Sequence, residues 1–349
     1  VGLATPVALA AGLNKAARNH ILIRDTSALE QMRNVDVVVF DKTGTLTEGH
    51  PTVIGWLWAQ GQEEHYKDVL LAAESTSDHP LAEAIVTALE GEEQVIPAHL
   101  DGFENITGKG VRVAYQGAEY WVGSHKLLKD YQANLSDILA DMLTQYESDG
   151  NSIVYFGREN DLLAVIAIKD QLRVTSMEAI RELRIQDIEI CMLTGDGERT
   201  ASSVAGSLGI MRFVADAMPD DKEDFIHKLQ LQGKTVAMVG DGVNDAQALS
   251  CADVSIAMGK GTDTLMDTAM ITLRTSDLLL LPKVFRLSRQ TVSLMYRNLF
   301  IYNAVGIFVA AGVLYPVYDI LLSPALAGAA MALSCVSVAL SSLRLSSRF

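Results

Sequence analysis

The stretch that decides the fold is Val35-Asp36-Val37-Val38-Val39-Phe40-Asp41-Lys42-Thr43-Gly44-Thr45-Leu46-Thr47. Its first six residues form an apolar, β-branched run, which predicts a buried strand of a parallel sheet. Asp41 then stands at the carboxyl end of that strand, which is the edge where open α/β sheets bind ligands. A carboxylate held there among threonine hydroxyls, backbone amides freed by a glycine, and a lysine can attack a phosphoryl group. The stretch therefore indicates a phosphoryl-transfer site.

Strand-then-loop units recur further along the chain. Apolar runs at 162–168, 188–193, 235–239 and 253–258 predict strands, and helical patterns lie between them at 174–186, 199–208, 219–231 and 244–250. Such alternation predicts a doubly wound parallel sheet. The first three of these strands are each followed by a carboxylate, namely Asp170, Asp196 and Asp241. This topology brings the carboxyl ends of its strands to one edge, so we expect these side chains near Asp41.

The segment 51–163 has a different character and interrupts the first strand-and-loop unit. It carries helical patterns at 66–75, 80–90 and 134–149 and short strand patterns at 111–115, 119–122 and 152–157. About a hundred residues is a common domain size, so the segment predicts an inserted α/β domain.

Composition separates the end of the chain from the rest. The chain has 349 residues, 49% of them hydrophobic, and a net charge of −15. Residues 276–349 carry six Lys/Arg and two acids, a net charge of +4, which leaves −19 for residues 1–275. An acidic body beside a basic, apolar tail indicates a membrane protein with a large cytoplasmic part. No basic stripe appears, which argues against nucleic acid as a partner.

Two almost uncharged runs, 298–315 and 320–343, lie in this tail. Both approach or exceed the length that spans a bilayer, and the basic residues lie outside the hairpin, so we expect a transmembrane hairpin with both outer ends in the cytoplasm. The alternative is a buried helical hairpin of a soluble protein. The three cysteines form no close pair, so the spacing signals neither a disulfide framework nor a zinc cluster.

Several motifs in order resemble the P-type ATPases, ion pumps that pass through an aspartyl phosphate, and their haloacid-dehalogenase-like core. The motifs are Asp41–Thr47, Thr194-Gly195-Asp196, Ala217-Met218-Pro219-Asp220-Asp221-Lys222 and Gly240-Asp241-Gly242-Val243-Asn244-Asp245. The resemblance implies that Asp41 is the phosphorylated residue, followed by Lys42 of the same motif. It also implies that Thr194 contacts the phosphoryl group, within a motif that Gly195 and Asp196 complete.

The remaining motifs imply the charge-neutralising part of the site. By the resemblance, Lys222 neutralises the phosphoryl group and Asp241 holds Mg²⁺ together with Asp41 and the backbone carbonyl of Thr43. Asn244 and Asp245 match residues that order the site. Physical chemistry agrees, because a phosphoryl transition state needs positive charge around its equatorial oxygens and Mg²⁺ prefers hard oxygen ligands.

The inserted segment carries two further motifs. Glu74-Ser75-Thr76-Ser77-Asp78-His79-Pro80-Leu81 and Thr107-Gly108-Lys109-Gly110-Val111 resemble the nucleotide-binding signatures of the heavy-metal-transporting P-type ATPases. The resemblance implies that Glu74, His79, Gly108 and Gly110 bind the adenosine part of ATP. By itself, a His before a helix-starting Pro is more often an ordinary surface residue.

The tail suggests which ion is carried. Tyr302-Asn303 and Met331-Ala332-Leu333-Ser334-Cys335 resemble patterns of copper(I) transporters, with Cys335 in the place of a serine. A thioether and a thiol are soft ligands that favour Cu(I). The alternative is that Met331 and Cys335 only pack within the bilayer.

Together these features predict the carboxyl-terminal part of a copper(I)-exporting P-type ATPase of a bacterial-type inner or plasma membrane. Its partners are then ATP, Mg²⁺, the metal ion, the bilayer and a cytosolic metallochaperone. The expected division is the end of a membrane helix and stalk at 1–34, a phosphorylation domain at 35–50 and 164–275, a nucleotide-binding domain at 51–163, and a stalk with two transmembrane helices at 276–349. Val1 reads as the interior of a longer polypeptide, so we expect an actuator domain and a Cys-Pro-Cys motif to be missing here.

Three alternatives remain open at the level of the sequence. A zinc- or cadmium-type pump usually places a lysine and an aspartate in these last helices, and neither occurs within the two runs. A soluble phosphatase of the same core usually has an acid/base aspartate two residues after the nucleophile, where Thr43 stands. The third is an inactive, truncated fragment that only binds nucleotide.

Overall fold

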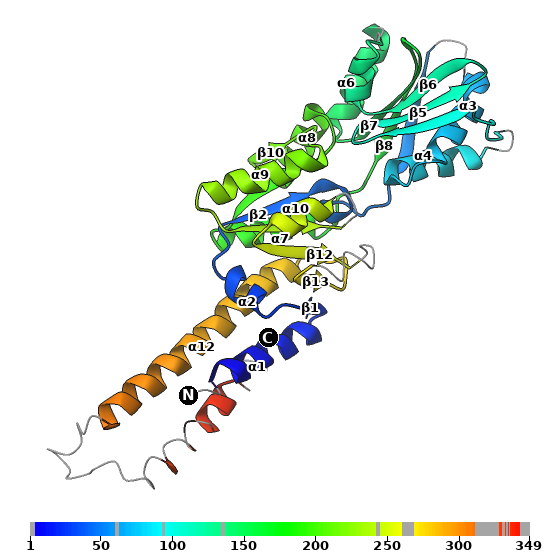
Figure 1. Ribbon diagram of the computed structural model, residues 1–349. Coiled ribbons are helices and arrows are strands. Elements are labelled where there is room, and N and C mark those ends of the chain that lie inside the picture. The colour runs from blue at the N-terminus through cyan, green and yellow to red at the C-terminus, as the bar shows by residue number, and fades with distance from the viewer. Residues whose placement is uncertain are drawn as a thin grey trace.

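The molecule is elongated, with two β-sheets at one end and a pair of long helices at the other (Figure 1). The computed structural model describes residues 4–59, 63–92, 95–133, 137–241, 245–259, 269–310, 328–329, 332, 334 and 336–342. The helices are α1 (Ala4–Arg18), α2 (Ser27–Met32), α3 (Glu63–Glu74), α4 (Pro80–Glu90), α5 (His125–Asp130), α6 (Asp137–Ser148), α7 (Ser176–Ile185), α8 (Glu198–Leu208), α9 (Pro219–Leu231), α10 (Ala246–Cys251) and α12 (Leu280–Ala310).

The strands belong to two sheets. They are β1 (Ile21–Ile23), β2 (Val37–Asp41), β3 (Thr52–Trp58), β4 (Gly102–Ile106), β5 (Gly110–Tyr115), β6 (Ala118–Gly123), β7 (Ser152–Arg158), β8 (Asp161–Lys169), β9 (Glu189–Leu193), β10 (Arg212–Val214), β11 (Val236–Gly240), β12 (Val254–Met258) and β13 (Ile271–Leu273).

The first sheet has seven strands in the order β1-β13-β12-β11-β2-β9-β10. All its pairings are parallel except β1 with β13. The predicted strand at 35–40 is β2, which is buried along its whole length at the centre of the sheet. Asp41 is the last residue of β2, so the predicted doubly wound fold and the position of the carboxylate are both confirmed.

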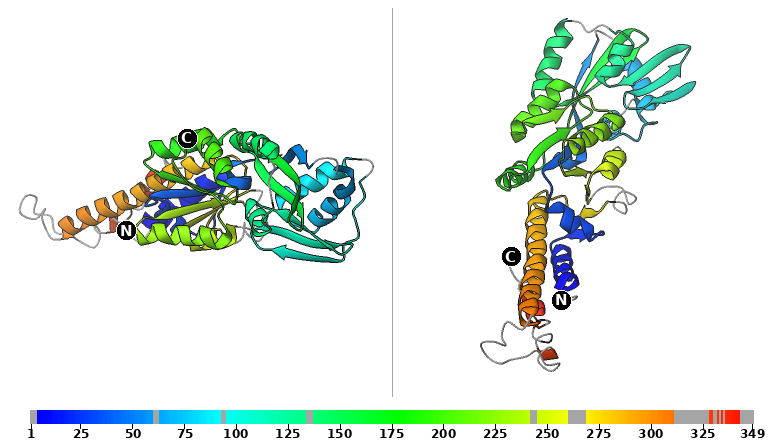
Figure 2. Two further views of the ribbon diagram at one scale, coloured as in Figure 1. Left: turned by 90° about the horizontal axis from the view of Figure 1, so that it is seen from above. Right: turned by 60° about the vertical axis from the view of Figure 1, so that its left-hand side comes forward.

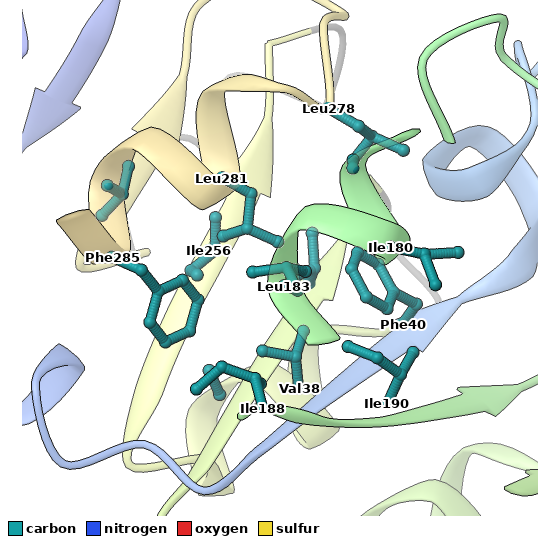
Figure 3. Packing of buried hydrophobic residues seen from close by; sticks show 14 of the residues in the cluster. Val38, Phe40, Ile180, Leu183, Ile188, Ile190, Ile256, Leu278, Leu281 and Phe285 are labelled. Atoms are coloured by element: carbon teal, nitrogen blue, oxygen red, sulfur yellow. The ribbon is translucent and has the colours of Figure 1, made fainter. Parts of the chain in front are cut away.

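Helices cover both faces of this sheet, which explains why β2 is apolar at every position before Asp41. Val38 and Phe40 belong to the core on one face, where α7 and the first turns of α12 pack. Figure 3 shows Phe40 beside Ile180 and Leu183 of α7, with Leu281 and Phe285 of α12 in the same cluster. Val37 and Val39 point to the other face and pack with residues of α9 and α10.

The second sheet has six strands in the order β3-β8-β7-β6-β5-β4, all antiparallel. Its strands come from the inserted segment, with one exception. The run 162–168 is β8, so the prediction that it belongs to the parallel sheet is wrong: it pairs with β3 and β7. An apolar run buried on both faces fits either kind of sheet, and periodicity cannot tell them apart. The predicted domain boundaries stay a prediction.

The long helices α1 and α12 run side by side away from the sheets, as two views show (Figures 1 and 2). Gly12 of α1 faces Thr291 of α12 so closely that an added Cβ would lie 2.8 Å from the threonine hydroxyl. Within the described part of the chain, no helix is long and apolar enough to cross a membrane. Most of the predicted transmembrane hairpin, 311–327 and much of 328–349, lies outside the described residues.

Candidate active site

The carboxyl ends of the three central strands meet as the topology predicts. β2 lies between β9 and β11, with Asp41 opposite Leu193 and Phe40 opposite Val239. Asp41 therefore stands beside the loops that begin at Thr194 and at Asp241. Asp41 is only 5% exposed, so its charge needs partners within the protein.

Lys222 supplies the main partner of Asp41. Its ammonium lies 2.6 Å from Asp41 Oδ1 and 2.7 Å from Asp245 Oδ1, and all three side chains are buried. Burial alone would lower the pKa of Lys222, but the two carboxylates outweigh it and raise that pKa above its ordinary value. The predicted positive charge is thus fixed beside the predicted nucleophile, 181 residues away in the chain.

Three carboxylates gather at the same edge and suit a divalent cation. Oxygens of Asp41, Asp241 and Asp245 lie within 4.8 Å of one another. Burial, with repulsion from Asp41, raises the pKa of Asp241 to about 7, and the same causes raise the pKa of Asp245. A cation would relieve this repulsion, and an all-oxygen donor set is the kind that Mg²⁺ prefers. The residues present therefore fit the predicted magnesium ion.

The loop after Asp41 is shaped so that it can pass close to Asp241. Gly44 has a φ of +71°, and an added Cβ would lie 1.4 Å from Asp241 Oδ2, so only glycine fits this position. Thr43 precedes it in an extended conformation and is half-buried. The role of the Thr43 carbonyl stays a prediction.

Lys42 binds the neighbouring loop. Its ammonium lies 2.5 Å from Asp196 Oδ2 and donates to Ser152 Oγ at 3.0 Å. Burial would favour the neutral form of Asp196, yet Lys42 holds the pKa of that carboxyl below its usual range. Thr194 Oγ1 donates to Asp196 Oδ2 at 2.8 Å, which orders the Thr194 loop. Gly195 between them is exposed, and an added Cβ would meet nothing nearer than 3.7 Å.

Two residues that follow β8, Asp170 and Arg173, bind the same loop, and the sequence pattern indicated only Asp170. Asp170 accepts from Thr47 Oγ1 at 2.5 Å and from the Gly49 amide at 3.1 Å. The buried Arg173 donates to the carbonyls of Gly44 and Thr45. The sequence signalled Asp170 as a strand-end carboxylate. Nothing in its pattern signalled Arg173 or Ser152, because their partners are distant backbone and loop atoms.

The predicted nucleotide residues lie toward this edge as well. His79 caps α4, with its Nδ1 accepting from the Leu81 amide at 3.2 Å. The packing around its ring lowers the pKa of His79, and the carboxylates of Asp196 and Asp41 oppose that shift. His79 is exposed at the surface, yet it lies close enough to Asp196 and Asp41 for their charges to act on its ring.

Two glycines and a buried carboxyl complete this group. Gly108 has a φ of +67°, and an added Cβ would lie 2.9 Å from Met218 Cε, just before α9. Gly110 has a φ of +143°, and its Cβ would clash with the Val122 carbonyl at 2.1 Å. Glu74 is 6% exposed at the end of α3, and burial raises its pKa to about 8. Glu74 is therefore largely neutral at pH 7.

Comparison with known families agrees with this geometry. Residues 35–253 match the haloacid dehalogenase-like hydrolases. The chain belongs to this family.

Sequence relatives confirm the resemblance to heavy-metal P-type ATPases. The chain is 42% identical to a copper-exporting P-type ATPase of Legionella pneumophila and 43% identical to a silver-exporting P-type ATPase of Salmonella typhimurium. Each alignment covers 99% of this chain, but only 47% and 42% of the two relatives. The chain thus spans less than half of these curated relatives.

Two solved structures show the same arrangement. A zinc-transporting PIB-type ATPase in an E2·Pi state matches 98% of this chain and 55% of its own, with a TM-score of 0.67 and 35% identity. The catalytic domain of the CPx-ATPase CopB-B matches 78% of this chain and 97% of its own, with a TM-score of 0.65 and 28% identity. The predicted haloacid-dehalogenase-like fold is therefore confirmed.

Several predicted site residues lie outside the described part of the chain or have no described side chain. Asn244, Met331 and Cys335 lie outside the described residues. Tyr302 and Asn303 lie in α12, for which the structure describes the helix but not these side chains. Ser334 is helical and half-buried. The predicted transported-metal site therefore stays a prediction.

Proposed function

We propose that this chain is the catalytic part of a copper(I)-exporting P-type ATPase and that Asp41 is phosphorylated by ATP. The observation that carries the proposal is the buried contact of Lys222 with both Asp41 and Asp245 at the carboxyl end of β2. A carboxylate held beside a fixed cation, at an edge lined by further carboxylates, is built for phosphoryl transfer rather than for structural support alone.

The chemistry at Asp41 follows from the groups around it. A carboxylate oxygen of Asp41 attacks the γ-phosphorus of ATP, the bond to the bridging oxygen breaks, and ADP leaves with that oxygen. Lys222 stabilises charge on the transferred group, and the Thr194 hydroxyl, beside Asp196, is available to donate to it. Asp41, Asp241 and the Thr43 carbonyl would hold Mg²⁺, which supplies charge neutralisation between the phosphates and the carboxylates when it is bound.

The nucleotide is proposed to bind at His79, Glu74 and the Gly108–Gly110 loop. Gly108 lies against Met218, so the loop reaches the start of the helix that carries Lys222. A base bound near Glu74 would extend its phosphates toward Asp41. The neutral carboxyl of Glu74 can donate as well as accept, which suits the mixed donor and acceptor edge of adenine.

Phosphorylation is tested with the full-length protein. Radiolabelled ATP should give an acid-stable, hydroxylamine-labile label, and Asp41→Asn should reduce it to background because the amide is not a nucleophile. Lys67→Met, a change at a partly exposed position on α3, is the control and should leave the label intact. Persistent labelling of Asp41→Asn would refute the assignment.

Copper(I) is the proposed cargo because the relatives named above export copper or silver, both soft monovalent ions. Zinc is the second candidate, since a solved structural relative transports zinc. Metal-stimulated ATPase activity of the full-length protein under reducing conditions separates the two. Stimulation by Zn²⁺ but not by Cu(I) would overturn the copper assignment and leave the phosphorylation proposal standing.

A further inference from the structure

Three metal-ligating side chains meet on the face of the seven-stranded sheet that α9 and α10 cover. Glu223 and His227 stand four residues apart on α9 and so share one side of that helix. Cys251 is the last residue of the neighbouring helix α10. One ligand atom of each lies within 4.8 Å of the other two. The group is separate from the Asp41, Asp241 and Asp245 cluster.

The two separations that involve Glu223 match those of a metal site. Cys251 Sγ lies 3.4 Å from Glu223 Oε1, and His227 Nε2 lies 3.5 Å from the same oxygen. Ligands about 2.0–2.3 Å from a tetrahedral zinc ion are roughly 3.3–3.8 Å from one another. Two of the separations therefore already suit one ion, and the third, between Cys251 Sγ and His227 Nε2, is within 4.8 Å.

Gln230 holds two of these ligands in place. Its side-chain oxygen lies 3.1 Å from His227 Nδ1, and its amide nitrogen donates to the Cys251 carbonyl at 2.9 Å. Metal-binding histidines usually have their second ring nitrogen held by such an outer partner, which fixes the tautomer and the ring orientation. Here that partner leaves Nε2 directed toward Glu223. The His227 side chain is about half exposed, so an ion can reach the group from solvent.

We propose that Glu223, His227 and Cys251 form a Zn²⁺ site on the outer surface of the phosphorylation region. A thiolate, an imidazole and a carboxylate make a zinc-type donor set, and the carboxylate disfavours Cu(I). Zinc displaces the thiol proton of Cys251, and water takes the fourth position. The cysteine spacing did not signal a zinc cluster, because the partners of Cys251 come from another helix and include a single histidine and a carboxylate.

The proposed zinc site joins two helices, α9 and α10, that also position residues of the candidate active site. Lys222 immediately precedes Glu223 in α9, and Asp245 immediately precedes α10. A bound ion would therefore tie together the helices whose first turns meet in the contact of Lys222 with Asp245.

Cobalt(II) binding to the purified chain tests the proposal, with excess Mg²⁺ present to occupy the carboxylate cluster. Co²⁺ should give a sulfur-to-metal charge-transfer band that Zn²⁺ abolishes by competition. Cys251→Ser should remove the band, whereas Cys335→Ser, which changes the predicted transport site, should keep it. Glu223→Gln and His227→Ala should each weaken Zn²⁺ binding by about 100-fold or more. His99→Ala, an exposed histidine elsewhere, is the matched control and should not.

Two results would overturn the proposal. One is a charge-transfer band that survives Cys251→Ser, because the thiolate would then come from another residue. The other is unchanged Zn²⁺ affinity in Glu223→Gln, a change that keeps the shape of the side chain and should not disturb folding. Circular dichroism of each variant verifies that the fold is kept before binding is compared.

Discussion

The two sheets treat charge in opposite ways. At the carboxyl edge of the parallel sheet, Asp41, Lys222 and Asp245 are buried and paired with one another. Around the antiparallel sheet, the ion pairs Lys67–Glu92 and Lys109–Asp130 lie in partly exposed positions, while the buried Glu74 has a pKa of about 8. Charges can be buried where a strand-end carboxylate such as Asp41 meets an opposite charge, here Lys222 of α9. Where no opposite charge compensates, a buried carboxyl such as Glu74 favours its neutral form.

Lys222→Met should have the largest effect on the free energy of unfolding and so tests the contrast between the two sheets. Removing the ammonium leaves two buried carboxylates without their cation, so the free energy of unfolding should fall by about 3–5 kcal/mol in Mg²⁺-free buffer. Lys67→Met removes a partly exposed pair and should change it by no more than about 1 kcal/mol. Urea denaturation measures both, and equal losses would contradict the contrast.

A pH series tests the neutral state of Glu74. Because burial raises its folded pKa to about 8, the folded state binds a proton that the unfolded state releases near pH 4–5. The carboxyl therefore destabilises the fold progressively as pH rises from that range to about 8, and not further above it. Glu74→Gln should remove this penalty and gain roughly 2–4 kcal/mol on the parent over the same window.

Thermal or urea unfolding at several pH values gives the measurement for Glu74→Gln. Glu83→Gln, which lies on the solvent side of α4, serves as the control and should show no such window. A constant difference between Glu74→Gln and the parent from pH 5 to 8 would mean that Glu74 is charged in the folded state.

The carboxylate cluster should respond to Mg²⁺ in a way that Glu74 does not. Asp241→Asn removes repulsion from Asp41, so it should stabilise the chain by about 1 kcal/mol without Mg²⁺. It should also abolish most of the stabilisation by Mg²⁺, which in the parent reaches about 2.7 kcal/mol at a hundred times the dissociation constant. Midpoints of unfolding across a Mg²⁺ titration measure both effects. A mutant that loses stability in both conditions would argue against a cation site here.

The smallest effect is expected at the loop where the two regions meet. Gly108→Ala forces a side chain into a φ of +67° and against Met218, which should cost about 1 kcal/mol. Gly117→Ala also places a side chain at a positive φ, +77°, but an added Cβ there has open space around it. The difference in unfolding free energy between the two variants therefore measures the contact with Met218. Calorimetry should show weaker ATP binding for Gly108→Ala and not for Gly117→Ala. If both variants bind ATP equally weakly, the nucleotide does not bind at the Gly108 loop.

The sequence predicted the parts of the fold that depend on local pattern. The β-branched run before Asp41 and the glycine-containing loop after it predicted the central strand and the candidate nucleophile. Lys222, Thr194 and Asp241 were assigned by resemblance, and the parallel topology explains why such distant residues meet. The helix at 80–90 was predicted to the residue because His79-Pro80 marks its start.

The misses depend on long-range pairing. β10 and β13 have three residues each, too few to show the alternation of a strand in the sequence. They are strands because they pair with neighbouring strands of the sheet. β8 was assigned to the parallel sheet because an apolar run does not indicate which strand it pairs with. Lys42 was predicted as part of the Asp41 motif, but its partner Asp196 stands 154 positions later, and this pairing becomes visible only in three dimensions.

The edge of the parallel sheet has a mechanical consequence. β1 begins three residues after α1 ends, β13 lies seven residues before α12, and the two strands pair antiparallel at the sheet's border. Both long helices are therefore fastened to the same border strands, and Gly12 packs against Thr291 between them. A tilt of the sheet would move the two helices together, as a rigid lever, rather than sliding one along the other.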